Sequence, residues 1–243
     1  MEEGENRVMR RLGTRVRLIR YSLRTNGLGN TVKNVFSTVA DFVYDLINGT
    51  DTRAWVALDD MMLEAGQKVG ANMYAPTHAF PLRRLFRDIN FPPGLVLLDL
   101  GCGKGRGQLI ASEFGFREAR GVEFSPVLCD IARRNCELYS IRRKTKTAFS
   151  VINADARDYA FRDDEDVVYL CDPFNGQIMM RVLELIADSL SRRDRTLWIV
   201  YKGPTERAVI ERSGLFAVEM EKLLCGQRYV VYAHRCEQGR ALG

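Results

Sequence analysis

Histidine and tryptophan are scarce in this chain, with two residues of each, and its six cysteines include no C-x-x-C pair. Zinc sites need closely spaced cysteine and histidine ligands, and disulfide frameworks occur in small secreted chains, so neither is predicted. No apolar run approaches the roughly 20 residues that a transmembrane helix requires. No signal-peptide pattern opens the chain either. We therefore expect reduced thiols, no metal and no membrane span, in a cytoplasmic protein.

Acidic residues are absent from Asn6 to Ala40. Seven arginines lie in this stretch, and apolar residues recur at helical spacing across residues 8–23, which predicts a basic amphipathic helix. Such a helix either binds RNA, an acidic partner or a membrane surface, or packs on the core with a solvated face. An arginine-rich stretch without acids is also typical of a mitochondrial presequence, but the glutamates at positions 2, 3 and 5 make a mitochondrial location the lesser expectation.

Helical patterns continue to about residue 90. They are centred on residues 32–47, 55–62 and 80–89. The Pro92-Pro93 pair ends the last of them, because proline cannot continue a helix. We therefore predict a helical N-terminal extension over residues 1–90.

From residue 91 onward, short β-rich runs alternate with helical patterns, which indicates an α/β fold with a doubly wound, mostly parallel sheet. Strands are predicted at 95–100, 119–123, 148–152, 166–171 and 195–201, and helices at 105–115, 126–140, 177–190 and 204–213. The end of the chain differs, since two β-rich runs at 216–224 and 227–235 flank Cys225-Gly226 without a helix between them. We predict an antiparallel hairpin there, as the last part of a second domain over residues 91–243.

The first strand runs directly into a glycine loop, Leu100-Gly-Cys-Gly-Lys-Gly-Arg-Gly107. Glycine permits positive φ and lets the backbone lie against a ligand. The dinucleotide-binding pattern G-x-G-x-x-G would require glycine at position 106, where this chain has arginine, so a nicotinamide-dependent oxidoreductase is disfavoured. Phosphate-loop nucleotide binding is disfavoured too, because Lys104 is not part of a G-K-[ST] sequence.

At this loop the chain resembles the class I S-adenosylmethionine-dependent methyltransferases. Their first motif is an acidic residue in the strand followed by G-x-G-x-G, and Asp99, Gly101, Gly103 and Gly105 match it. The resemblance covers roughly residues 74 to 234. It implies a Rossmann-like sheet of seven strands, S-adenosylmethionine as the cofactor, and these four residues as part of its binding site.

Three further acids each end a predicted strand. The resemblance implies that Glu123 binds the ribose hydroxyls and that Asp155 faces the adenine amino group with Ala156 beside the ring, while Asp172 ends the fourth strand. Parallel α/β sheets bind ligands beyond the carboxyl ends of their strands, so these acids should meet in one crevice. The alternative is that each is an ordinary helix cap or turn residue.

Upstream, Tyr74-Ala-Pro-Thr77 is similar to Y-x-P-T segments in some lysine methyltransferases. In those enzymes the segment folds over the methionine end of the cofactor, which implies that Tyr74 and Thr77 are lid residues. Thr77 as a helix N-cap is the alternative. The N-terminal part, including residues 49–52, is also similar to uncharacterised bacterial methyltransferase-like proteins, which names no substrate.

The candidate catalytic residues are Asp172, Pro173, Phe174 and Asn175. Methyltransferases that act on amino groups carry a [D/N]-P-P-[Y/F/W] motif here, in which the polar side chain and a proline carbonyl accept hydrogen bonds from the acceptor NH2 and the ring stacks on its plane. This chain has one proline fewer. Phe174 therefore either stacks on the acceptor or packs against the following helix.

We predict transfer of a methyl group to a polar atom, with nitrogen favoured. The leading acceptor is a protein side chain such as lysine. An amino group of RNA or DNA comes second, with nucleic acid contacting the basic N-terminal helix. A small-molecule acceptor and a non-catalytic S-adenosylmethionine-binding module remain as further alternatives.

Overall fold

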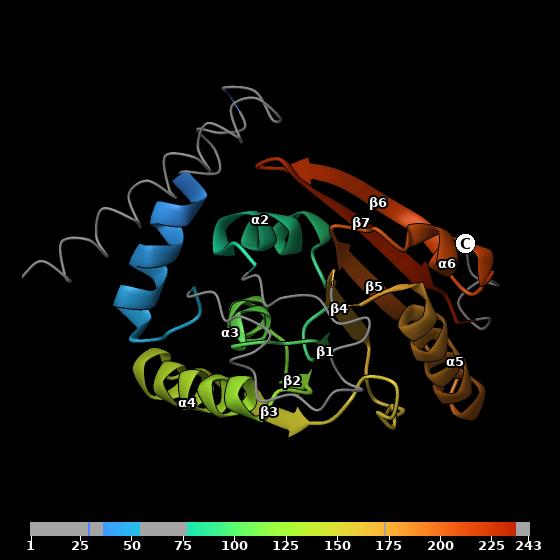
Figure 1. The fold of residues 1–243 in the computed structure, drawn as a ribbon, viewed down its shortest axis with the longest axis horizontal. Coiled ribbons are helices and arrows are strands. Elements are labelled where there is room, and N and C mark those ends of the chain that lie inside the picture. Colours follow the sequence, from blue (N-terminus) through green and yellow to red (C-terminus); the bar gives the residue numbers. More distant parts are fainter. Residues whose placement is uncertain (1–28, 30–35, 54–76, 173, 237–243) are drawn as a thin grey trace, which may run out of the picture.

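The computed structural model of this chain describes residues 29, 36–53, 77–172 and 174–236 (Figure 1). The basic helix predicted across residues 8–23 and the helix predicted at 55–62 lie outside these residues. Of the predicted site residues, Tyr74 and Pro173 also lie outside them. Residues 36–48 are helical, as their apolar periodicity predicts.

The molecule is built on one sheet of seven strands in the order β3-β2-β1-β4-β5-β7-β6. The strands are β1 (Val96–Leu100), β2 (Glu118–Glu123), β3 (Ala148–Asn153), β4 (Val167–Cys171), β5 (Leu197–Lys202), β6 (Ala217–Leu224) and β7 (Gln227–His234). The first five are parallel to one another, and β7 pairs antiparallel with both β5 and β6. The predicted Rossmann-like fold with a closing hairpin is therefore confirmed.

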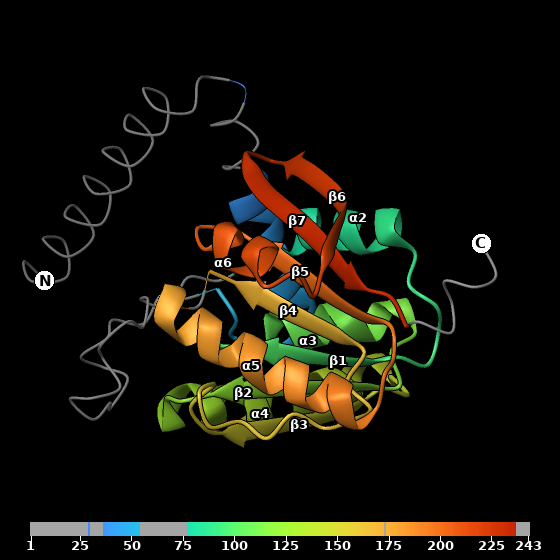
Figure 2. The ribbon, with the colours of Figure 1, turned by 90° about the vertical axis from the view of Figure 1, so that its right-hand side faces the viewer.

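Helices cover both faces of the sheet (Figures 1 and 2). They are α2 (Ala79–Ile89), α3 (Arg106–Ala111), α4 (Pro126–Arg143), α5 (Gly176–Arg192) and α6 (Arg207–Arg212). The helix predicted at 105–115 is shorter than expected, because α3 tightens into a 3-10 turn, η2 (Ser112–Phe114), and Gly115 then ends it at φ +77°. Left-handed backbone of this kind stops a helix and favours glycine.

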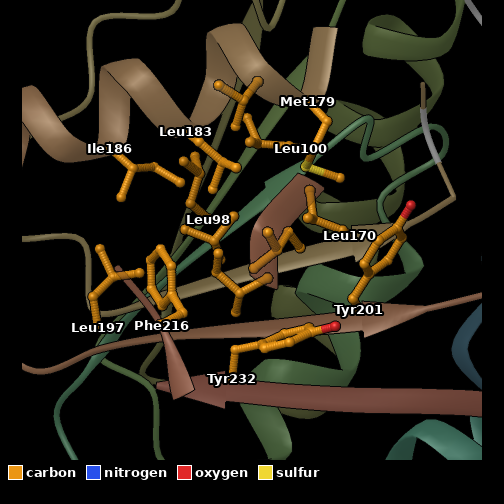
Figure 3. Packing of buried hydrophobic residues seen from close by; sticks show 14 of the residues in the cluster. Leu98, Leu100, Leu170, Met179, Leu183, Ile186, Leu197, Tyr201, Phe216 and Tyr232 are labelled. Carbon is orange, nitrogen blue, oxygen red and sulfur yellow. The ribbon is translucent and has the colours of Figure 1, made fainter. Parts of the chain in front are cut away.

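Side chains alternate between the two faces of each central strand, and each face has its own core. Leu98 and Leu100 of β1 and Leu170 of β4 pack against α5, as Figure 3 shows. Their neighbours in sequence, Leu97 and Tyr169 among them, pack on the opposite face against α2, α3 and α4. A strand buried on both faces reads as a continuous apolar run.

The N-terminal residues pack on the second of these faces. Tyr44, from the helix at residues 36–48, is buried in the same cluster as Leu85 and Phe86 of α2. Asp41 of that helix caps α2 from a distance in sequence, since its carboxylate accepts the backbone N–H of Ala79 at 2.9 Å and lies 2.6 Å from His78 Nδ1. The N-terminal helix and α2 thus share one core with β1 and β4.

Candidate cofactor and acceptor site

The glycine loop joins β1 to α3 at the carboxyl edge of the sheet. Gly101, Gly103 and Gly105 have φ values of +75°, +54° and +86°, which only glycine adopts without strain. The loop turns back over β2, because the N–H groups of Gly101 and Cys102 both donate to the carbonyl of Val122, at 2.8 and 3.1 Å. The loop therefore lies beside the end of β2.

Glu123, the last residue of β2, lies against this loop. Its side chain is 3% exposed, and its two oxygens accept the N–H groups of Gly103 at 2.9 Å and Ser125 at 3.0 Å. Burial raises the pKa of Glu123 to about 7, against the lowering effect of these N–H groups. A carboxylate has about four acceptor positions, so Glu123 retains capacity for the hydroxyls of a bound ribose.

Asp99 is the second buried carboxyl at the loop. It is 2% exposed, and burial, together with the charge of Glu123, raises its pKa to about 8. Among the described residues, none donates a hydrogen bond to it. A buried carboxyl without a donor calls for an explanation, and S-adenosylmethionine brings an ammonium group to such a site. The two buried carboxyls beside the glycine loop, Asp99 and Glu123, therefore fit that cofactor.

Gly107 in α3 has no room for a side chain, because it faces β1 and β4 directly. A Cβ atom there would lie 2.3 Å from Asp99 Oδ2 and 3.1 Å from Tyr169 Cδ1. We expect Gly107→Ala to lower the free energy of unfolding by about 1–3 kcal/mol, because overpacking outweighs the better helix propensity of alanine. Urea unfolding measures this. Gln177→Ala, at an exposed position of α5, should leave stability within about 0.5 kcal/mol, and an equally small effect at Gly107 would contradict the close approach.

Asp155 follows β3 and is held by Arg157. One oxygen accepts the backbone N–H and Nε of Arg157 at 2.9 and 3.0 Å, and the other accepts Nη2 at 2.7 Å. The hydrogen bonds from Arg157 lower the pKa of this carboxyl, so it is ionised. An adenine amino group would share it with Arg157. Ala156 packs at the rim of the core cluster that contains Leu100 and Val122, close to the ends of the central strands.

Asp172 follows β4 in a left-handed conformation, with φ +43°. Its N–H donates to the carbonyl of Lys202 at 3.1 Å, and its Oδ1 accepts the hydroxyl of Thr205 at 2.6 Å. Thr205 lies 3.4 Å from the hydroxyl of Tyr201, the residue before Lys202 in β5. Asp172 is therefore oriented by the loop after β5. The sequence patterns gave no sign of Thr205.

The next two candidates have clear packing roles. Phe174 is 5% exposed and belongs to the core cluster that contains Met179 and Val182 of α5, which is the packing alternative considered for this ring. Asn175 is the N-cap of α5, since its side chain accepts the N–H of Ile178 at 3.2 Å. Catalytic roles for these two residues stay predictions.

Thr77 is buried, unlike an exposed lid residue. Its hydroxyl lies 2.8 Å from Tyr169 Oη, and its carbonyl accepts Arg106 Nη1 at 2.9 Å. It is not the N-cap of α2, because His78 occupies that position. Whether Thr77 also contacts the cofactor stays a prediction.

The two basic residues that flank Gly105 were not predicted as part of the site. The side chains of Lys104 and Arg106 are buried, and both pair with carboxylates of the N-terminal segment, on Asp51, Asp41 and Asp45. The sequence patterns showed only that Arg106 breaks the dinucleotide motif. The sequence does contain acidic residues at 41, 45 and 51 that could neutralise these two cations. Periodicity reports only local structure, however, and cannot predict that residues 50 to 65 positions apart will pair.

Two features are absent from the part of the chain that the structure describes. No three His, Cys, Asp or Glu side chains there are grouped so that they could hold a metal ion. No helix there combines the length and hydropathy that crossing a membrane requires.

Comparison with known proteins adds independent evidence. Residues 98–180 match the methyltransferase domain family, and this stretch runs from β1 through the glycine loop, Glu123 and Asp172 into α5. No curated protein matches the chain in sequence.

Similar folds occur among solved structures at low sequence identity. An RNA methyltransferase from Salinibacter ruber in complex with S-adenosylhomocysteine is 19% identical, with 66% of this chain and 94% of that chain covered and a TM-score of 0.51. A tRNA methyltransferase of B. subtilis is 17% identical, with 66% and 68% covered and a TM-score of 0.51. A ribosomal protein methylase from Lactobacillus delbrueckii subsp. bulgaricus is 11% identical, with 67% and 81% covered and a TM-score of 0.51.

The solved structures support only the fold of this chain. The domain match is a match in sequence, and residues 98–180 include most of the predicted site residues. The strand order, the glycine loop with positive φ at all three motif glycines, and the buried acids beside it agree with the domain match. Residues 98–180 thus form a methyltransferase domain within a class I-like fold, and together these findings support an S-adenosylmethionine-dependent methyltransferase.

Proposed function

We propose that this enzyme methylates an aliphatic nitrogen of a protein, with the lysine side chain as the leading acceptor. The observation that carries the proposal is the contrast between Asp172 and Phe174. Asp172 ends β4 at the carboxyl edge of the sheet, where a carboxylate can receive an amine. Phe174 is buried against α5, so it offers no ring on which a planar base would stack.

The chemistry asks mainly for orientation. The cofactor supplies the methyl group on a sulfonium, and the acceptor lone pair must face it at about 3 Å with water excluded. Asp172 accepts a hydrogen bond from the amine and thereby directs its lone pair. Thr205, which donates to Asp172 Oδ1 at 2.6 Å, fixes the carboxylate in turn. A lysine ammonium must also lose one proton to solvent before it attacks.

Charge at the crevice supports a protein rather than a nucleic-acid acceptor. Nucleic-acid binding depends on basic side chains that reach phosphates. Near the ends of the described strands, Lys104 and Arg106 pair with carboxylates, Arg157 pairs with Asp155, and Lys202 Nζ lies 3.4 Å from Cys171 Sγ. The similar structures include methyltransferases of RNA and of a ribosomal protein, so the fold alone does not choose between the two.

Labelling of a cell extract tests the acceptor class. We expect the enzyme and S-adenosylmethionine with a radioactive methyl group to label material that protease digestion removes and nuclease digestion leaves intact. Acid hydrolysis of the labelled protein should then release methylated lysine. Asp172→Asn is the control that should leave the extract unlabelled.

Two other results would contradict the proposal in different ways. Label that nuclease removes would make an RNA or DNA amino group the acceptor. Absence of label in every extract, although calorimetry detects S-adenosylmethionine binding, would favour a non-catalytic binding module.

A further inference from the structure

The guanidinium of Arg106 connects the start of α3 to three separate parts of the N-terminal segment. Its Nε donates to Thr52 Oγ1 at 2.7 Å. Its Nη1 donates to the carbonyl of Thr77 at 2.9 Å and pairs with Asp41 Oδ2 at 2.8 Å, and Nη2 lies 3.5 Å from Asp45 Oδ2. Arg106 is the first residue of α3, directly after Gly105, so its side chain anchors the end of the glycine loop.

Asp45 shapes the loop that receives this guanidinium. Its Oδ1 accepts the hydroxyls of Thr50 and Thr52 at 2.8 and 2.6 Å. Its Oδ2 accepts the backbone N–H groups of Thr52 and Arg53, each at 3.1 Å. The loop after the N-terminal helix is thus wrapped around one buried carboxylate, and Thr52 Oγ1 links that carboxylate to Arg106.

A second connection lies on the other side of Gly105. Lys104 Nζ pairs with Asp51 Oδ2 at 2.9 Å; the lysine side chain is 3% exposed and the aspartate side chain 61% exposed. Asn135 of α4 joins the two segments, because its Nδ2 donates to the carbonyls of Asp51 and Lys104 at 3.0 and 2.9 Å. Its Oδ1 accepts the N–H of Asp51 at 2.9 Å. The glycine loop is therefore held on both flanks.

From these contacts we infer that residues 41–53 are positioning residues for the cofactor. They hold the glycine loop in its binding shape through Lys104 and Arg106, without touching the cofactor themselves. Figure 1 shows this segment (blue) beside the α3 and α4 side of the sheet. The inference rests on the assignment of Gly101, Gly103 and Gly105 to the cofactor site, and it does not depend on the acceptor.

A matched pair of variants at Thr52 tests the inference. Thr52→Val keeps the shape of the side chain and removes the hydroxyl, which leaves Arg106 Nε and Asp45 Oδ1 each without this partner. Thr52→Ser keeps the hydroxyl. We expect Thr52→Val to weaken S-adenosylhomocysteine binding about tenfold, as expected for a lost buried hydrogen bond, and Thr52→Ser to stay within about twofold of the unaltered protein.

A purely structural role would lower the melting temperature without changing the affinity of the folded protein. Calorimetry is therefore run well below the melting temperature of each variant. Arg195→Gln serves as a stability control, because Arg195 Nε donates to the carbonyl of Glu165 at the amino ends of β4 and β5, away from the glycine loop. It should lower the melting temperature and leave the affinity unchanged.

Hydrogen exchange supplies a second readout. Coupling between two sites is reciprocal, so S-adenosylhomocysteine should slow the exchange of the Thr52 and Arg53 amides, which donate to Asp45. The slowing should be smaller in Thr52→Val. Equal affinities in Thr52→Val and Thr52→Ser, or exchange that the ligand leaves unchanged, would overturn the inference.

A separate variant tests whether the glycine loop is the cofactor site at all. Gly103→Arg should abolish binding, since a side chain there would occupy the space where the loop backbone meets the ligand. If Gly103→Arg binds normally, the glycine loop is not the cofactor site. If it does not bind while Thr52→Val does, only the role of residues 41–53 is wrong.

Discussion

S-adenosylhomocysteine should bind about tenfold more tightly at pH 8 than at pH 6, and Glu123→Gln should remove most of this dependence together with about 100-fold of the affinity at pH 8. Burial raises the pKa of Glu123 to about 7, so the ligand-free protein holds a proton there at pH 6. We expect the ribose hydroxyls to donate to the ionised carboxylate, and hydrogen bonds to a charged group contribute about 1.5–3 kcal/mol each. Calorimetry over this pH range measures both effects.

Glu118 is the matched control for Glu123. It lies at the opposite end of the same strand, where it pairs with Arg120. Glu118→Gln should leave the affinity and its pH dependence unchanged. A pH dependence that persists in Glu123→Gln would instead assign the titration to Asp99, whose pKa is raised to about 8 by burial and by the charge of Glu123.

The same raised pKa affects the stability of the ligand-free protein in a defined direction. Between pH 4.5 and about 7 the unfolded chain has lost the Glu123 proton that the folded protein still holds. The unfolded state then binds fewer protons, so the contribution of Glu123 to the free energy of unfolding falls as pH rises through this window. Cofactor binding should offset this loss, because we expect the ribose to bind the ionised form.

Asp172→Asn should reduce methyl transfer by about 10²–10⁴-fold, the range typical of a group that assists proton transfer or orients the attacking atom. S-adenosylhomocysteine affinity should stay within about threefold, because the role that we propose for Asp172 concerns the acceptor. Radioactive methyl incorporation measures transfer, and calorimetry measures binding. A large loss of affinity with normal transfer at saturating cofactor would contradict this role.

Thr205 provides the accompanying comparison. Thr205→Val removes the hydroxyl that donates to Asp172 Oδ1, and Thr205→Ser retains it. Transfer should fall in the valine variant and be largely preserved in the serine variant, with cofactor affinity unchanged in both. Equal rates in the two variants would show that the carboxylate does not depend on this hydroxyl.

The sheet was predictable because its strands are buried on both faces. β1 is apolar except for Asp99, and all five of its residues are buried, so periodicity and turn residues located it within one residue. The terminal hairpin was located equally well from Cys225-Gly226 between two β-rich runs. Such elements can be predicted from local sequence, because the apolar pattern that indicates a strand lies on the same residues that form it.

The contacts around the glycine loop were not predictable by the same means. Arg106 meets Asp45 across 61 positions of sequence, and no local pattern states which distant carboxylate a buried arginine will select. Phe174 illustrates a different limit. From sequence alone, an aromatic residue next to a candidate catalytic acid could either stack on the acceptor or belong to the core. The packing of Phe174 with Met179 and Val182 supports the core role.

Asp41 and Asp45 also bear on how this enzyme can be shortened or fused. A chain trimmed at residue 90, where the helical part gives way to the sheet, would keep all seven strands but would lose Asp41, Asp45 and Asp51, whose carboxylates pair with Lys104 and Arg106. The two cations beside Gly105 would then lose these ion pairs, and Arg106 would also lose the hydrogen bonds that it donates to Thr52 and Thr77. Catalytic fragments and fusion proteins should therefore start before residue 36.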